Sequence, residues 1–141
     1  MADIWVNGSR RGSCLGLALG LMVLGVLIPA SADERFPFDR ELLLDTKPMR
    51  GSKRIPGLEI SAGGQAAIDL WCNSGRGQVV IAADTITIIP GAMSERQCGP
   101  DQMRGDVDML ATLNQVTNWK REGNFVVLIG PKTLRFRPAT N

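Results

Sequence analysis

The sequence predicts a mainly β fold: a small antiparallel, barrel-like or coiled sheet of about eight short strands, with one α-helix inserted before the last three strands. Short segments in which apolar and polar residues alternate recur along the chain. Turn-forming residues, mainly Gly, Pro, Asn and Asp, separate these segments. Only the stretch after Cys98 changes to a helical period. A row of successive hairpins leaves unpaired strands at its two edges, which can pair with other chains. A closed or strongly coiled sheet is therefore the expected arrangement.

The predicted strands are short and mostly bounded by turn residues, and in chain order they are 39–45, 58–60, 66–72, 78–82, 85–89, 118–121, 125–129 and 133–137. The third strand shows the clearest alternation, which predicts one buried face. Pro90-Gly91 is expected to end the fifth strand. The segment Asn73–Gly77 is expected to be a plain turn, with an anion-binding nest of backbone amides as the alternative left open. Trp71 and Trp119 lie in strand patterns, where aromatic side chains are more often packed than exposed as binding anchors.

A helix is predicted to begin at Pro100. Proline is favoured at a first helical position, and Asp101 suits the positive end of the helix dipole. Gly105 costs roughly 1 kcal/mol relative to alanine inside a helix, so this helix is expected to depend on packing against the sheet. The predicted core-facing stripe consists of Met103, Val107, Leu110, Ala111 and Asn114.

Residues 1–32 have the pattern of a secretory signal peptide. Two arginines precede an apolar run, Leu15–Ile28, and small residues ending at Ala32 follow it. The run has 14 residues, fewer than the roughly 20 that span a membrane as a helix, so cleavage near Ala32 is expected. Cys14 stands at the start of the run and not after it, so no lipid attachment is expected.

Cleavage would leave residues 33–141 as a single domain, periplasmic or secreted, without a transmembrane segment. These residues carry 14 Lys and Arg against 13 Asp and Glu, a balance that argues against nucleic-acid binding. The chain has no histidine, which removes the usual base of a serine triad and a usual zinc ligand. No spacing of the acidic residues selects a catalytic pair. The sequence therefore predicts a monomeric protein that is not an enzyme and uses no cofactor or metal.

Cys72 and Cys98 are the only cysteines expected to survive processing, and they are predicted to form a disulfide. A cysteine pair in an exported domain is more often structural than reactive. The functional alternative, a redox pair, lacks the Cys-x-x-Cys spacing that lowers a thiol pKa. Closing a loop of about 27 residues is expected to stabilise the domain by roughly 3 to 4 kcal/mol in the chain-entropy model.

A basic loop over residues 46–57 contains Lys47, Arg50, Lys53 and Arg54 within eight residues. Such a cluster can attract lipid phosphates, acidic glycan or an acidic protein. The plainer interpretation is a solvated loop that keeps the domain soluble, and it is favoured here. The loop is nevertheless the best functional candidate, so the predicted partner is an envelope protein or an anionic component of the envelope.

Several motifs, taken in order, resemble those of a known family. They are Trp71-Cys72-Asn73 followed by Gly75, the strand pattern Asp84–Ile88, the run Glu95–Pro100 that holds Cys98 and Pro100, and Thr133–Phe136. In this order they resemble the META/HslJ-like domain family over about residues 38–137. Trp71 stands where that family often has glycine.

The resemblance implies a compact β-rich domain of the bacterial envelope, linked in some members to heat or antibiotic stress, with no established catalytic residue. We therefore expect a non-enzymatic periplasmic protein that acts as an envelope-stress accessory or binding module. The alternative is a small periplasmic inhibitor or sequestering protein that acts on an envelope enzyme.

Overall fold

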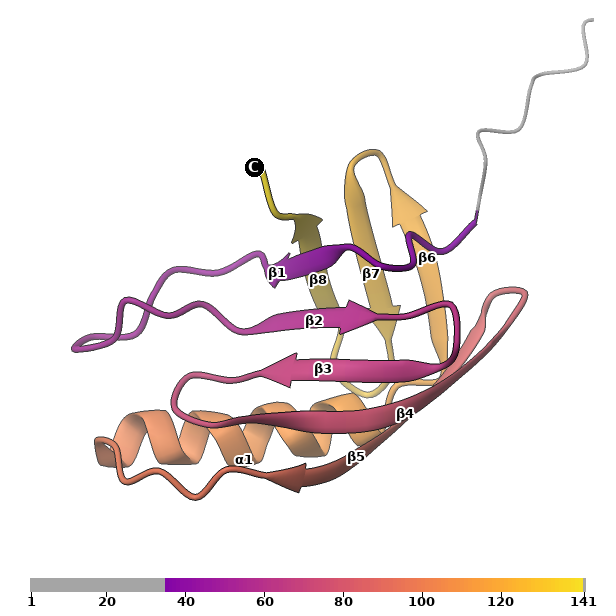
Figure 1. The fold of residues 1–141 in the computed structure, drawn as a ribbon. Helices are drawn as coiled ribbons and strands as arrows, with labels where there is room; N and C mark the ends of the chain where they lie inside the picture. Colours follow the sequence, from indigo (N-terminus) through magenta and orange to yellow (C-terminus); the bar gives the residue numbers. More distant parts are fainter. Residues whose placement is uncertain (1–34, 141) are drawn as a thin grey trace, which may run out of the picture. The chain divides into compact units, whose positions relative to one another are not determined.

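The computed structural model describes residues 35–140, so the predicted signal peptide over 1–32 lies outside the described residues. Each strand pairs antiparallel with the next along the chain, and the last pairs with the first, so the sheet closes into a ring (Figure 1). The mainly β class, with one helix before the last three strands, is confirmed. The elements are β1 Glu41–Leu44, β2 Gly57–Ile60, β3 Gln65–Asp69, β4 Ser74–Ala82, β5 Thr85–Met93, α1 Pro100–Asn114, β6 Asn118–Glu122, β7 Phe125–Ile129 and β8 Leu134–Pro138.

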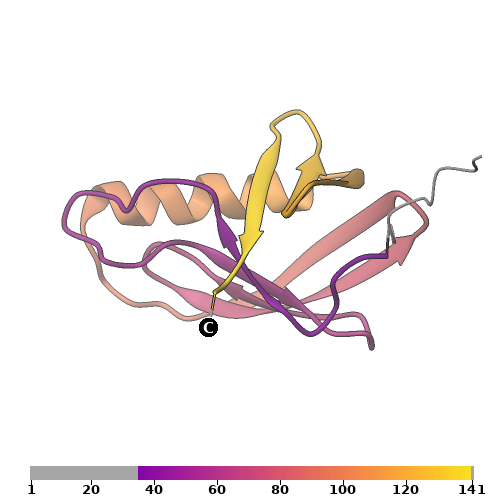
Figure 2. The same ribbon diagram turned by 90° about the horizontal axis from the view of Figure 1, so that it is seen from above.

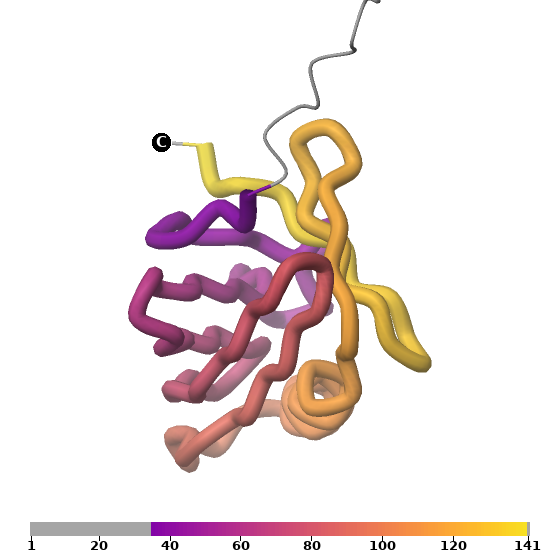
Figure 3. Tube along the Cα trace, turned by 90° about the vertical axis from the view of Figure 1, so that its right-hand side faces the viewer, coloured from indigo at the N-terminus to yellow at the C-terminus, as the bar shows by residue number. Residues whose placement is uncertain are grey.

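Helix α1 completes the wall of the ring where strand pairing is weakest. Strands β5 and β6 pair through Thr85 and Asn118, and beyond this point α1 lies against β5 (Figure 3). Figure 2 shows the helix along one face of the strands β2 to β4, while in Figure 1 the strands β6 to β8 cross those strands steeply. Met109 and Leu113 of the helix join the same hydrophobic core as the strands. The helix is therefore a structural part of the ring. Within residues 35–140, no helix has the length and apolar character needed to cross a membrane.

Side chains fill the interior of the ring. Trp119 also belongs to this core, and its ring meets that of Phe36 edge-on with centroids 5.1 Å apart. Burial of apolar surface at about 25 cal/mol per Å² is the main force that holds such a ring together. The least exposed core residues come from most of the elements: Leu42, Leu58, Ile60, Ile68, Leu70, Ile86, Ile88, Leu113, Val126, Leu128 and Phe136.

The prediction that Asn73–Gly77 forms a turn is wrong, because strand β4 begins at Ser74. Gly75 pairs with both Ile68 and Met93, and the register with β5 shifts between Gly75 and Gly77. A Cβ on Gly77 would lie 2.7 Å from the carbonyl oxygen of Ile89, so glycine permits this close approach. The Asn73 N–H donates to Asp106, the Ser74 N–H donates to Ser94, and the residues from Gly75 onward pair within the sheet, so the alternative of a nest for an external anion is wrong as well. The same pairing carries β5 past Pro90-Gly91, where the sequence predicted its end.

The predicted core-facing stripe of the helix is also wrong. The buried residues of α1 are Asp106, Met109, Thr112 and Leu113, whereas Val107 is 66% exposed. Met103 and Leu110 are half-buried, and Ala111 and Asn114 are exposed. The buried face contains two polar residues that hydropathy assigns to solvent: Asp106 accepts hydrogen bonds from the link between β3 and β4, and the Thr112 hydroxyl donates to the carbonyl oxygen of Asp108 at 2.7 Å.

The turn between β4 and β5 holds Ala83 in a left-handed backbone conformation, with φ 53°. A positive φ at the first residue of a two-residue hairpin turn favours glycine. Trp119 fixes this turn, because its backbone N–H donates to the Asp84 carbonyl oxygen and its indole N–H to that of Ala83, both at 2.8 Å. The strain is therefore retained by contacts with β6.

We expect Ala83→Gly to raise the free energy of unfolding by about 1 kcal/mol, because glycine does not resist a positive φ. Urea unfolding measures the change. The matched control is Ala82→Gly, the same chemical change at the end of β4, which is expected to lower stability by about 0.5 to 1 kcal/mol. Destabilisation by both variants would contradict the assignment of strain to Ala83.

Candidate functional site

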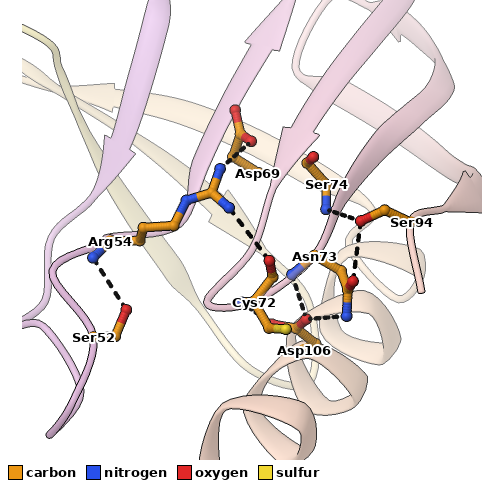
Figure 4. Close-up of polar contacts among 8 residues, drawn as sticks. All are labelled: Ser52, Arg54, Asp69, Cys72, Asn73, Ser74, Ser94 and Asp106. Carbon is orange, nitrogen blue, oxygen red and sulfur yellow. Dashed lines mark hydrogen bonds and ion pairs between the residues drawn. The ribbon is translucent and has the colours of Figure 1, made fainter. Parts of the chain in front are cut away.

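Three connections meet at one end of the domain (Figure 1): the basic loop between β1 and β2, the link from β3 to β4, and the link from β5 to α1. Figure 4 shows the polar contacts that join them. We call Cys72, Asn73, Ser94, Cys98 and Asp106 the disulfide corner. Trp71, Gly75 and Pro100, which the sequence singled out with the two cysteines and Asn73, lie at or beside this corner, whereas Trp119 lies against the β4–β5 turn.

The structure contains the predicted disulfide between Cys72 and Cys98, with Cα atoms 6.0 Å apart. Cys72 is 2% exposed, whereas Cys98 is exposed. The bond joins the link after β3 to the residue before Gly99, the N-cap of α1. It therefore ties the start of the helix to the sheet. At that start, Pro100 is the first helical residue as predicted, and the Gln102 side chain accepts the Gly99 N–H at 3.2 Å.

Asp106 is the buried centre of the corner, at 4% exposure. Its carboxylate accepts three hydrogen bonds: from the backbone N–H of Cys72 at 3.0 Å, from the backbone N–H of Asn73 at 2.8 Å, and from the Asn73 side-chain amide at 3.1 Å (Figure 4). The two backbone N–H groups belong to a link that leaves the sheet ladder, so they need a partner elsewhere. The helix supplies that partner through one side chain.

Asn73 joins the helix to the link before it. Its side-chain NH₂ donates to Asp106. Its side-chain oxygen, Oδ1, accepts the Arg96 backbone N–H at 2.7 Å and the Ser94 hydroxyl at 3.0 Å. The Ser94 oxygen in turn accepts the Ser74 N–H at 3.1 Å. An amide can donate on one side and accept on the other, which neither a carboxylate nor an apolar side chain can do. This explains why asparagine follows the cysteine at this position.

Trp71 and Trp119 are both buried, at 8% and 6% exposure, so neither is an exposed binding anchor. Trp71 lies against the helix at Gly105. A Cβ on Gly105 would lie 2.6 Å from Cδ1 of Trp71 and 2.5 Å from Cε of Met49 in the basic loop. Gly105 therefore lets the helix, the indole ring and the loop approach one another.

We expect Gly105→Ala to lower the free energy of unfolding by about 1 to 3 kcal/mol, the usual cost of overpacking. In an exposed helix the same change raises stability by about 1 kcal/mol, so the sign identifies the close approach. Urea unfolding gives the measurement. Val107→Ala, at an exposed position of the same helix, is the control and is expected to be neutral or slightly stabilising. A stabilising Gly105→Ala would contradict the packing of Trp71 described above.

The four cations of the basic loop fall into two groups. Arg54 donates one guanidinium N–H to Asp69 at 3.1 Å and another to the Cys72 carbonyl oxygen at 3.3 Å. It therefore holds the loop against the disulfide corner. Lys47, Arg50 and Lys53 are exposed. The sequence grouped the four as one candidate surface, but the structure gives Arg54 a contact that the other three do not share among the described interactions.

The corner is suited to holding segments together. The Asp106 carboxylate is buried and receives three N–H donors, and it is anchored between helix and sheet. Among residues 35–140, no three His, Cys, Asp or Glu side chains are grouped to hold a metal ion. Sequence reasoning singled out Cys72, Asn73 and Cys98, gave Ser94 and Arg96 no role of their own, and missed Asp106. The one signal for Asp106 was its spacing of three and seven residues before Met109 and Leu113, which places all three on one helix face.

Comparisons with known proteins agree with this fold. None of the curated proteins matches the chain. Among solved structures, the NMR structure of a protein from Burkholderia xenovorans is similar, with a TM-score of 0.61 and 15% sequence identity, over 74% of this chain and 84% of that chain. At this identity the likeness shows the fold alone. The family described as META domain matches residues 40–140. The chain therefore belongs to the META domain family.

Proposed function

We propose that this META-domain protein is an exported, non-catalytic binding module of the bacterial envelope, and that it meets its partner with its outer surface. The observation that carries the proposal is the filled interior of the ring. Side chains from all eight strands and from the helix are buried there. The space that holds a ligand in larger barrels is occupied by the protein's own side chains.

The disulfide corner supports the non-catalytic part of the proposal. A general base must reach the proton that it abstracts, but the Asp106 carboxylate lies at 4% exposure with its oxygens engaged by Cys72 and Asn73. The corner is better suited to a structural role. An accessory role in envelope stress agrees with the family resemblance, and inhibition or sequestration of an envelope enzyme is the alternative.

The cysteine pair supports export. Disulfides persist in oxidising compartments such as the periplasm, and the bond between Cys72 and Cys98 lies in the same chain as the signal-like pattern over 1–32. We expect the protein to lose its first 32 residues and to act in the periplasm or outside the cell.

Two measurements on protein from cells that express the full chain test this function. Intact mass is expected to show a chain that begins at Asp33, with both cysteines oxidised. A chain that keeps residues 15–28 or carries a lipid would overturn export as a soluble protein.

The second measurement is cross-linking in intact cells, followed by purification of the protein with whatever it has bound. An accessory module is expected to recover an envelope component without abolishing an enzyme's activity. Stoichiometric recovery of one inactive envelope enzyme would establish the inhibitor instead. Turnover of a substrate by the purified protein would overturn the non-catalytic assignment.

A further inference from the structure

The basic loop has a defined shape at its tip. The Ser52 N–H donates to the Met49 carbonyl oxygen at 2.9 Å, and the Arg54 N–H donates to the Ser52 hydroxyl at 3.1 Å. Gly51 takes φ 81° between them, a value that glycine adopts without strain. Residues 49–54 therefore form a hydrogen-bonded turn that presents Arg50 and Lys53.

This turn is attached to the domain on both sides. On one side, Met49 reaches the helix at Gly105, beside Trp71. On the other side, Arg54 bonds to the Cys72 carbonyl oxygen and to Asp69. Attachment at both ends gives the exposed cations between them a fixed direction relative to the ring. A loop that only kept the domain soluble would not need these attachments.

The charges of the loop are not balanced by its neighbours. Residues 46–56 contain no Asp or Glu. Two acids beside the loop are engaged: Asp45 lies 3.7 Å from the Arg135 guanidinium, and Asp69 pairs with Arg54. Lys47, Arg50 and Lys53 are exposed and take part in none of the ion pairs among residues 35–140.

Two other cations lie beside this end: Arg96, which directly follows Glu95 in the β5–α1 link, and, on the helix, Arg104. Asp101 and Asp108 stand three residues before it and four after it on the helix, and acids at these spacings share its face. Its charge is therefore offset locally. The unbalanced positive charge belongs to the loop.

The loop also projects. In Figures 1 and 2 it extends past the first turn of α1 and past the ends of β2 and β3. Cations on a projecting loop are poorly placed to enclose a small anion or to line a groove for a peptide. It can reach an extended surface of negative charge, to which each Lys or Arg near the surface adds about 1 kcal/mol of attraction.

We propose that Lys47, Arg50 and Lys53 form a docking surface for anionic phospholipid membranes, held in place by Met49 and Arg54. The inference rests on the proposed location in the envelope, and it names the partner of the outer surface. The domain would then lie with its disulfide corner toward the lipid and with the β4–β5 hairpin away from it (Figure 1).

Vesicle binding by the exported protein tests the proposal. Wild type is expected to co-sediment with phosphatidylglycerol vesicles at low salt and not with phosphatidylcholine vesicles. The variant Arg50→Gln/Lys53→Gln is expected to bind phosphatidylglycerol vesicles roughly 25-fold more weakly, about five-fold for each cation. Added salt at 0.5 M should remove the difference, because it screens charges beyond a few ångströms.

The matched control is Arg121→Gln/Lys132→Gln, which removes one arginine and one lysine from exposed positions on β6 and in the β7–β8 turn. It is expected to bind like wild type. If both variants lost vesicle binding equally, the effect would depend on net charge alone, and the proposal of a docking surface would be overturned. Unchanged binding of the loop variant, or absence of wild-type binding at low salt, would also overturn it.

Two further outcomes distinguish other partners and the proposed function. Binding to soluble polyglutamate but not to vesicles would point to an acidic protein and overturn the lipid proposal. An intact mass that shows no export would overturn the proposed function whatever the vesicles show. Arg54 is kept in every variant because of its contact with Cys72, and urea unfolding of each variant confirms that the fold is retained.

Discussion

Replacing both Cys72 and Cys98 by alanine is expected to lower the free energy of unfolding by roughly 3 to 4 kcal/mol. The bond spans a sequence separation of 26 residues, so removing it gives the unfolded chain a large gain in conformational freedom. Small domains are stable by roughly 5 to 15 kcal/mol in total, so the loss is a large share. Urea unfolding of the oxidised wild type and of the double variant measures the difference.

The position of the bond predicts which part loosens first. Cys98 directly precedes Gly99, the N-cap of α1, so without the bond this link is held to the sheet by the hydrogen bonds that Ser94 and Arg96 make with Ser74 and Asn73. Helix signal in circular dichroism is therefore expected to fall at lower urea than tryptophan fluorescence. Wild type reduced with dithiothreitol is the control and should behave like the double variant. Equal stability of the double variant and oxidised wild type, or free thiols at both cysteines in exported protein, would contradict the structural role.

Alternation along the sequence predicted the strands well wherever one face is buried. In β3 and β5, residues such as Ile68, Ile86 and Ile88 point into the core while their neighbours face solvent, so burial has the same period of two as the strand. Turn residues then separate one strand from the next. The predicted ends were less accurate, because the pairing of β4 with β5 continues through Gly75, Gly77 and Pro90.

The helix shows why a buried face can escape prediction. Its position after Cys98 followed from Pro100 and from the change of period, but its orientation depends on contacts made by a polar side chain. Asp106 is buried because two backbone N–H groups of the β3–β4 link require an acceptor. Hydropathy assigns a carboxylate to the solvent-facing side of a helix. The core-facing stripe was therefore predicted one residue further around the helix, at Val107.

The candidate site was predicted in parts. Cys72, Asn73 and Cys98 were recognisable from their order in the chain, but the residues that give Asn73 its role are 21 to 33 positions away. The contact of Met49 with Gly105 is of the same kind. A single sequence shows which residue types are present, whereas these pairs arise only when the ring closes and brings distant links together.

Asp106→Ala is expected to lower the free energy of unfolding by about 3 to 5 kcal/mol. It leaves the backbone N–H groups of Cys72 and Asn73, and the side-chain amide of Asn73, without their acceptor. A buried donor that loses its partner costs about 1 to 3 kcal/mol. Asp106→Asn keeps one acceptor oxygen, but its side-chain NH₂ group then faces an N–H donor of Cys72 or Asn73. We therefore expect an intermediate loss of stability.

Asp108→Ala is the matched control for this prediction, because it removes an exposed carboxylate from the same helix. Surface changes of this kind stay within about 0.5 kcal/mol. Urea unfolding of the three variants under oxidising conditions, with the disulfide intact, isolates the contribution of the hydrogen bonds from that of the covalent bond. If Asp106→Ala were as stable as Asp108→Ala, the hydrogen bonds of Asp106 would not stabilise the domain, and the disulfide and the core packing of Met109 and Leu113 would hold α1 in place.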